Sequence, residues 1–318
     1  MANLYLINAS TMTNIADAIR SKTGVTNTFT PAQMIDTINN MGGGGIAINL
    51  EPAKYRSSAI TQYTGSETNI LNNAFQDCRS LTTVSFSQCI NIFGEVFYGC
   101  YGLTTITFPK CIYIGGSAFR LCNSLTTASF PECKIVSSNA FVGCSNLTTI
   151  SFPKCEYIGF QAFSACSSLT TVSFPKCKYV GSYAFTYDTS LTTALFPECE
   201  CISSNGFSHC QNMVTTSFPE CKRLESCAFH ACTKLQFISL PKCEYIGYEA
   251  FNYCTLLTSL YLNGVSSVPT LQSSANNVFD NSPLSTGGTG KIYVPSSLYN
   301  AFRTATYWSN ITARLVSM

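Results

Sequence analysis

A phenylalanine recurs every 22 residues through most of this chain, nine times without a slip. A fixed period of this length is typical of a repeat array, in which each unit stacks on the one before it. One repeat holds only about eight apolar side chains, so neighbouring repeats must share a single core. The period therefore predicts an elongated solenoid with a long surface and argues against a closed catalytic pocket. The nine residues are Phe75, Phe97, Phe119, Phe141, Phe163, Phe185, Phe207, Phe229 and Phe251.

The stretch from residue 162 to residue 181 shows how one repeat is built. Apolar and polar residues alternate from Thr171 to Phe174, which is the period of a half-buried strand. Pro175 removes a backbone donor and ends that strand. The second half of the repeat, from Lys178 to Phe185, is too short for a stable helix, so we expect a second short strand or a single helical turn on the opposite face.

The repeat also resembles a known family. The pattern Leu169-x-x-Val172-x-Phe174-x-x-Cys177 fits the leucine-rich repeat L-x-x-L-x-L-x-x-N/C. Together with the 22-residue period and the run AF-x-x-C-x-x-L, it is similar to the BspA-like leucine-rich repeats over about residues 70–263. The resemblance implies an α/β repeat solenoid, rich in β-structure and right-handed, which ends in a degenerate turn and a strand-helix cap.

The first 41 residues lack the repeat and predict a small helical hairpin with its own apolar faces. The glycines at positions 42–45 then predict a flexible joint. We therefore divide the chain into a hairpin (1–41), a glycine linker (42–45), an N-terminal cap of the solenoid (46–69), the solenoid itself (70–263) and a degenerate last turn with the C-terminal cap (264–318).

Two segments of the hairpin, IADAIRSKTG (15–24) and TPAQMIDTI (30–38), resemble N-terminal segments in tail proteins of phages and prophages of Gram-positive gut bacteria. The resemblance implies attachment to a virion through other tail or baseplate proteins. A DNA-binding helix-turn-helix is the alternative, but only Arg20 and Lys22 are basic. The residues expected to make the attachment are Ile15, Ile19, Met34, Ile35 and Ile38.

The composition argues against some classes of binding partner. The net charge is +2, so nothing indicates binding to nucleic acid or to an anionic membrane. No apolar run approaches 18 residues, so we expect no membrane insertion. The start MANLYLINAS has no basic region followed by a long apolar one, and we expect it to lack a secretory signal.

All but two of the eighteen cysteines fall in two columns with the 22-residue period, which begin at Cys78 and Cys89. We expect small, buried and reduced thiols that act as weak donors toward loop carbonyls. The expected Cα spacing between neighbouring turns would allow disulfide bonds, but the Cβ vectors of residues in register run parallel and disfavour them. Linear columns also lack the clustering that zinc needs. Asp188 takes one place in the first column, and Cys201 and Cys227 lie outside both, where we expect exposed thiols.

Two columns on the predicted surface are candidate binding sites. Tyrosines at Tyr113, Tyr157, Tyr179 and Tyr245 would offer stacking faces to sugars if they are exposed, and simple packing between turns is the alternative.

On the strand face, Thr127, Thr149 and Thr171 belong to a flat hydroxyl array. That array could bind a polymer surface, ice or a crystal, or it could merely be a solvated face of residues that favour strands.

The position after the second cysteine column alternates in charge at every step. Stacking in register would place opposite charges side by side and avoid repulsion between turns. We interpret it as an exposed ladder of ion pairs. Its members are Lys134, Glu156, Lys178, Glu200, Lys222 and Glu244.

Catalytic motifs are absent from the sequence. It has no H-E-x-x-H, G-x-S-x-G or P-loop pattern, and its only histidines, His209 and His230, fall on adjacent turns. We expect no enzyme activity, no cofactor and no metal. The favoured function is a phage tail or receptor-binding protein that recognises a bacterial surface glycan or protein. It would be made in the host cytoplasm and located in the virion. The alternative is a BspA-like adhesin on a bacterial surface, and homo-oligomer formation stays open.

Overall fold

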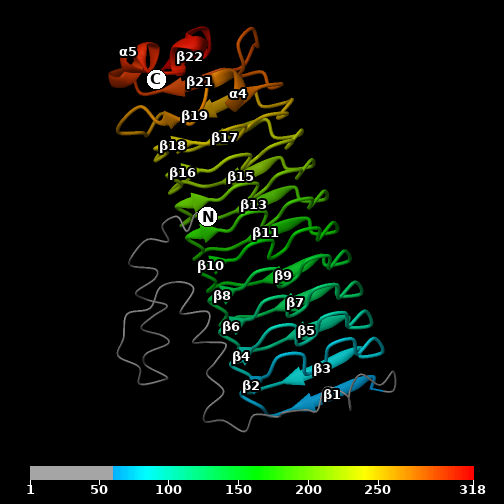
Figure 1. Ribbon diagram of the computed structural model, residues 1–318. Coiled ribbons are helices and arrows are strands. Elements are labelled where there is room, and N and C mark those ends of the chain that lie inside the picture. Colours follow the sequence, from blue (N-terminus) through cyan, green and yellow to red (C-terminus); the bar gives the residue numbers. More distant parts are fainter. Residues whose placement is uncertain (1–59) are drawn as a thin grey trace, which may run out of the picture.

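The computed structural model of the chain describes residues 60–318. They form a parallel-strand β-solenoid of about 12 turns with few helices, which confirms the predicted repeat fold (Figure 1). The predicted hairpin, the glycine linker and the first part of the predicted cap, up to residue 59, lie outside the described residues. Within residues 60–318, no helix is both long and apolar enough to cross a membrane.

Each regular turn begins with a strand of three or four residues on one side of the solenoid. These strands pair in parallel with the strands of the neighbouring turns and form sheets of five, three and four strands. In β11 (Thr171–Ser173), Val172 is buried between two exposed residues, as the alternation predicts. The other strands of this side are β1 (Gln62–Gly65), β3 (Thr83–Phe86), β5 (Thr105–Thr107), β7 (Thr127–Ser129), β9 (Thr149–Ser151), β13 (Thr193–Leu195), β15 (Thr215–Ser217), β17 (Phe237–Ser239), β19 (Ser259–Tyr261), β21 (Lys291–Val294) and β22 (Leu315–Ser317).

After the loop that contains the proline, each turn adds a second strand of only two residues. These short strands form one continuous sheet of ten parallel strands along a second side. The second half of the repeat is therefore a strand, one of the two outcomes expected from the sequence. The strands are β2 (Asn69–Ile70), β4 (Asn91–Ile92), β6 (Tyr113–Ile114), β8 (Ile135–Val136), β10 (Tyr157–Ile158), β12 (Tyr179–Val180), β14 (Cys201–Ile202), β16 (Arg223–Leu224), β18 (Tyr245–Ile246) and β20 (Thr270–Leu271).

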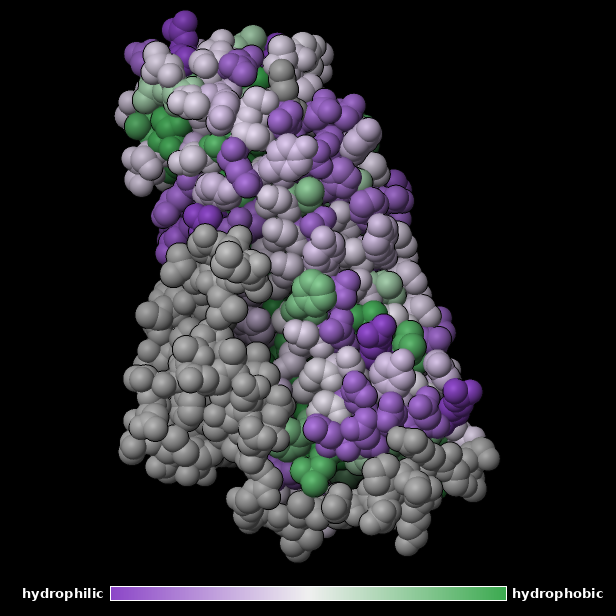
Figure 2. All heavy atoms as spheres, in the orientation of Figure 1, coloured by the Kyte–Doolittle hydropathy of each residue, from purple (hydrophilic) through white to green (hydrophobic). Residues whose placement is uncertain are grey.

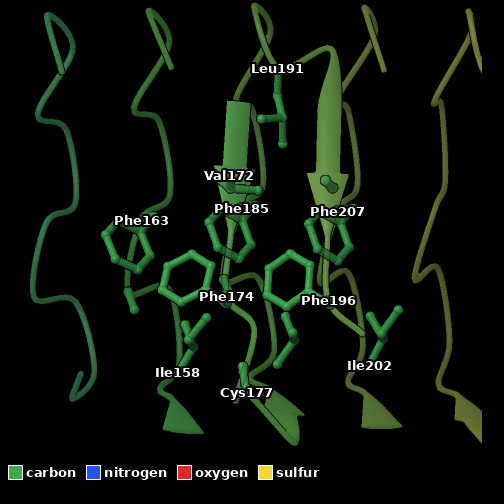
Figure 3. Close-up of a cluster of buried hydrophobic side chains, with 14 of the residues drawn as sticks. Ile158, Phe163, Val172, Phe174, Cys177, Phe185, Leu191, Phe196, Ile202 and Phe207 are labelled. Carbon is green, nitrogen blue, oxygen red and sulfur yellow. The ribbon is translucent and has the colours of Figure 1, made fainter. Parts of the chain in front are cut away.

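Phenylalanine rings fill the interior in two staggered rows (Figure 3). In one row, Phe163 and Phe185 stack with their ring centroids 5.3 Å apart. In the other, Phe174 and Phe196 stack at the same distance, and Phe174 packs against Phe163 at 5.7 Å. Since each ring contacts rings of its own turn and of both neighbours, the turns fold and unfold as coupled units.

The two cysteine columns are buried, as predicted, and their thiols face carbonyl oxygens. Cys100 Sγ donates to the carbonyl of Phe75 at 3.0 Å, and Cys111 Sγ donates to that of Tyr113 at 3.2 Å. Burial raises the pKa of Cys144 to about 12, so this thiol stays protonated at neutral pH. The expectation of exposed thiols outside the columns is wrong, because Cys201 and Cys227 are both half-buried.

A third side, which we call the turn side, carries two columns of residues in the left-handed conformation. They lie two positions before and two positions after each phenylalanine of the 22-residue period, with φ between 53° and 73°, and Asn281 takes the corresponding place after Phe279. Glycine, asparagine and aspartate adopt this conformation most readily. The first column is Asn73, Glu95, Ser117, Asn139, Gln161, Tyr183, Asn205, Cys227 and Glu249; the second is Asp77, Gly99, Leu121, Gly143, Ala165, Tyr187, His209, Ala231, Tyr253 and Asn281.

The C-terminal end of the core is covered by a small cap, as expected from the sequence. It contains α4 (Ala275–Phe279), α5 (Tyr299–Thr304) and the 3-10 helices η1 (Ser296–Leu298) and η2 (Trp308–Arg314). The buried Trp308 donates from Nε1 to the carbonyl of Pro269 at 2.7 Å and packs against Phe302. The cap thereby closes the last apolar turn, which a solenoid needs for solubility.

Outside this core, the visible surface is mainly hydrophilic or weakly polar, with hydrophobic residues only in small separate patches (Figure 2). Only 11% of the residues are charged, so most of this polarity comes from neutral side chains.

Candidate functional site

The hydroxyl face lies on the first strands. One threonine column is structural, because Thr126 Oγ1 and Thr148 Oγ1 each donate to the carbonyl one turn earlier at 3.1 Å. The next column contains the predicted binding residues. Of these, Thr149 and Thr171 are exposed and Thr127 is half-buried. Binding by this column stays a prediction.

The predicted tyrosine column is covered more than expected. Tyr113 is only 3% exposed, so the expectation of an exposed ring is wrong at this position. Tyr157 and Tyr179 are half-buried, and their rings stack in parallel with centroids 5.3 Å apart. Burial raises the pKa of Tyr179, whose hydroxyl accepts a hydrogen bond from Ser203 Oγ at 2.6 Å. The rings have packing partners, because successive two-residue strands place this column side by side in register.

Tyr245, the last member of the column, is half-buried as well. The guanidinium of Arg223, which is directly paired with it in the neighbouring strand, lies 4.3 Å from its ring centroid. Arg223 is held in turn by Glu225 Oε1 at 2.9 Å. This face of the ring is therefore already occupied by a cation, which stabilises the stack between turns.

A different row of rings lies on the turn side, and sequence reasoning missed it. It comprises the exposed Tyr187 and Tyr253 with the half-buried His209 and His230 between them, and we call it the aromatic ribbon. Successive ring centroids lie 4.7, 5.3 and 5.7 Å apart across four turns. Tyr187 is 54% exposed and Tyr253 is 50% exposed, so both present ring surface to solvent. A second exposed pair, Phe160 and Tyr183, packs edge to face at 5.8 Å on the same side.

The backbone at these positions is unfavourable for large side chains. Tyr187, His209 and Tyr253 all occupy the second left-handed column, with φ of 63°, 61° and 58°. A residue with a β-carbon pays about 1–2 kcal/mol in this conformation, and glycine or asparagine pays less. Other turns place glycine at this position, as at Gly99 and Gly143. Leucine and alanine also occupy it, as at Leu121 and Ala165, so the backbone conformation by itself does not select an aromatic residue here.

His209 lies beside Tyr187 in the ribbon. The pKa of His209 is lowered, first by desolvation and then by the nearby charge of His230, which favours the uncharged imidazole of His209. His209 Nδ1 lies 2.8 Å from Ser208 Oγ, which fixes the ring orientation. The exposed tyrosine rings, with apolar faces and polar edges, suit stacking against sugars or other flat apolar surfaces.

Ion pairs run along the solenoid in two ladders. The predicted one is present in part, with Lys222 Nζ 3.0 Å from Glu200 and Lys134 Nζ 4.0 Å from Glu156. A second ladder was missed, because its signs do not alternate at every step. Each exposed pair contributes about 0–1 kcal/mol, so the ladders serve register more than stability. The second ladder pairs Glu132 with Lys154, Lys176 with Glu198, and Glu220 with Lys242.

Comparison with known proteins agrees with this geometry. The model of the BspA type leucine-rich repeat region, in six copies, matches residues 68–192 and 178–312. The chain belongs to this family. Proteins of the family are often found on cell surfaces and suggest a binding or adhesin role, on a fold that is typically a non-enzymatic scaffold.

Solved structures share the repeat at low identity. A leucine-rich repeat protein from Bacteroides ovatus is 19% identical over 82% of this chain and 84% of that one, with a TM-score of 0.46. The leucine-rich repeat protein of T. pallidum is 28% identical over 46% and 72%, with a TM-score of 0.43. A leucine-rich cell surface protein from Faecalibacterium prausnitzii is 20% identical over 79% and 81%, with a TM-score of 0.41. No curated protein matches the chain.

Proposed function

We propose that the chain is a non-enzymatic receptor-binding protein whose turn side recognises a glycan on a bacterial surface. The observation that carries this proposal is the aromatic ribbon. The exposed rings of Tyr187 and Tyr253 are joined by the half-buried rings of His209 and His230, so that four successive turns carry one row of aromatic rings. Such a row can stack against several sugar units of one polymer at once.

The setting we favour is a phage tail. The support is the resemblance of residues 15–38 to N-terminal segments of tail proteins. In this proposal, the hairpin attaches the chain to other tail or baseplate proteins and the solenoid contacts the host. The second candidate is a bacterial surface adhesin, which membership of the BspA-type family favours.

The binding proposal is tested by Tyr187→Asn and Tyr253→Asn, singly and combined, in the full chain. Asparagine already occupies the second left-handed column at Asn281, so we expect the fold to be kept or slightly stabilised. Adsorption to bacterial cells or to isolated cell-wall glycan should fall at least ten-fold in the double variant. Loss of binding without loss of stability is the signature of a functional side chain.

Leu121→Asn is the matched control. It introduces asparagine at the same position of another turn, three turns before Tyr187 and outside the ribbon. It should therefore leave adsorption unchanged. If both tyrosine variants adsorb like the wild type, the ribbon is not the recognition surface. A parallel variant on the hydroxyl face, Thr149→Ala with Thr171→Ala, then shows whether binding belongs to that face.

The tail setting is tested separately by mass spectrometry of purified virions. The chain should be present in the virion, and Ile35→Asp with Ile38→Asp should prevent its incorporation while cell adsorption by the free protein is kept. Finding the chain on bacterial envelopes and never in virions would favour the adhesin.

A further inference from the structure

Three metal-ligating side chains meet on the turn side beside the aromatic ribbon. Cys227 Sγ lies 3.7 Å from Glu249 Oε2, and His230 Nδ1 lies 3.8 Å from the same oxygen. All three ligand atoms lie within 4.8 Å of one another, and all three residues are half-buried. Among the described residues, this is the one cluster that meets these criteria.

The repeat itself brings these residues together. Cys227 and Glu249 occupy the first left-handed column on adjacent turns, so they are stacked directly on each other. His230 follows Cys227 by three residues, and its backbone N–H donates to the Cys227 carbonyl at 3.0 Å. The His230 ring packs edge to face against Tyr253 and at a tilt against His209. The fold thus places the three ligands close together before any ion arrives.

Existing hydrogen bonds do not satisfy this cluster. His230 Nδ1 is buried and has no hydrogen-bond partner within residues 60–318. The thiol of Cys227 makes only a long contact with the carboxylate. A buried polar atom without a partner is rare and needs an explanation.

The donor set selects the metal. Thiolate, imidazole and carboxylate together suit zinc, while calcium and magnesium take oxygen ligands only. Zinc bonds of about 2.0–2.3 Å in tetrahedral geometry place neighbouring ligand atoms about 3.3–3.6 Å apart. The two distances to Glu249 are within about half an ångström of that range, while Cys227 Sγ and His230 Nδ1 lie within 4.8 Å of each other. Rotation of the Cys227 and His230 side chains must therefore bring these two atoms closer when an ion binds.

We propose that Cys227 Sγ, His230 Nδ1 and Glu249 Oε2 bind a zinc ion, with the fourth position open to solvent. The ion would link two adjacent turns of the solenoid at the ribbon. The proposal goes beyond the proposed function and replaces the expectation from sequence that the chain holds no metal. Three protein ligands with one open position leave room for water or for an oxygen of a bound molecule.

The test uses the full chain, purified without a histidine tag, reduced and stripped of metal with a chelator. Titration with zinc, followed by calorimetry, should show one equivalent bound. Substitution with cobalt(II) should give thiolate-to-cobalt charge-transfer absorption and the visible bands of a tetrahedral site. These bands report coordination by a cysteine directly and do not depend on activity.

Two variants use residues that the same column already carries in other turns, serine at position 117 and glutamine at position 161. Cys227→Ser should abolish the charge-transfer band, and Glu249→Gln should weaken zinc binding at least ten-fold, with unchanged circular dichroism. Cys201→Ser, at the other half-buried thiol, is the control. It should keep both the charge-transfer band and the affinity for zinc. The proposal is overturned if the wild type binds no zinc at micromolar concentration, or if Cys227→Ser keeps the cobalt band. Normal adsorption by a zinc-free Cys227→Ser variant would leave the ribbon proposal intact.

Discussion

Asp188 should act as a pH-dependent weak point in the core. It is fully buried at a position where the neighbouring turns have cysteine. Oδ1 accepts a hydrogen bond from the Cys166 backbone N–H at 2.8 Å, while Oδ2 is buried without a partner among the described residues. In the next turn, Cys210 Sγ donates to the Phe185 carbonyl at 3.1 Å. A protonated Asp188 can make the equivalent donation to the carbonyl of Phe163, and an ionised one cannot.

Desolvation by burial raises the pKa of Asp188 well above its ordinary value. Because the folded pKa is the higher one, the stability contributed by the protonated group is fully present below the unfolded pKa of about 3.9. It is lost as pH rises toward the folded pKa. The loss amounts to about 1.4 kcal/mol for each pH unit between the two values.

Asp188→Asn removes the titration and keeps the geometry, because its amide can donate while its oxygen still accepts from Cys166. We expect the stability difference between variant and wild type to grow with pH above 4, by about 1.4 kcal/mol per unit. The free energy of unfolding in urea, measured for both proteins from pH 4 to pH 7, tests this. The contributions of other titrating groups cancel in the difference between the two proteins. Glu244→Gln, which makes the matching acid-to-amide change at an exposed position, is the control. A difference independent of pH, or a less stable asparagine variant at pH 7, would refute the reasoning.

Three further predictions concern the core and the thiols. Phe163→Ala should cost about 3–5 kcal/mol in urea unfolding, because it leaves a cavity in the ring stack, and a smaller cost would mean that the row relaxes around it. Thr216→Val should stabilise by about 1 kcal/mol, because it removes a buried hydroxyl without a partner; destabilisation would reveal a bound water there. In the metal-free chain, a thiol reagent should modify Cys227 first, whose pKa is raised to about 11, before Cys201 with a pKa of about 12. Fast reaction of most thiols would contradict the buried columns.

The solenoid could be predicted from sequence because the same pattern of apolar residues recurs in every repeat. A single copy such as residues 162–181 fits a strand only weakly, but nine copies fix the period, the columns and the parallel register. The paired residues Thr171 and Thr193 are 22 positions apart, as the period requires. Errors in a single repeat average out over the array.

Burial within a surface column could not be predicted in the same way. Tyr179 and Val180 form a strand of only two residues, too short for alternation to show which side chain is covered. The outcome depends on neighbours in space, since Tyr157 stacks on one side of Tyr179 and Ser203 bonds its hydroxyl. The aromatic ribbon was missed for a related reason. Its rings come from two adjacent columns and only four turns; the one signal was the 21-residue separation of the two histidines.

The features that we propose to be functional lie where the repeat is broken. A column with the same residue type on every turn, such as the phenylalanine rows, is explained by stacking alone. The left-handed columns tolerate many residues, because their side chains leave the turn without entering the core. Two neighbouring turns can then carry Cys227 and Glu249 while others carry serine or glutamine, since all four residue types meet the same backbone conformation. The backbone does not select the rings of Tyr187 and Tyr253, and binding is the role that we propose for these two exposed side chains.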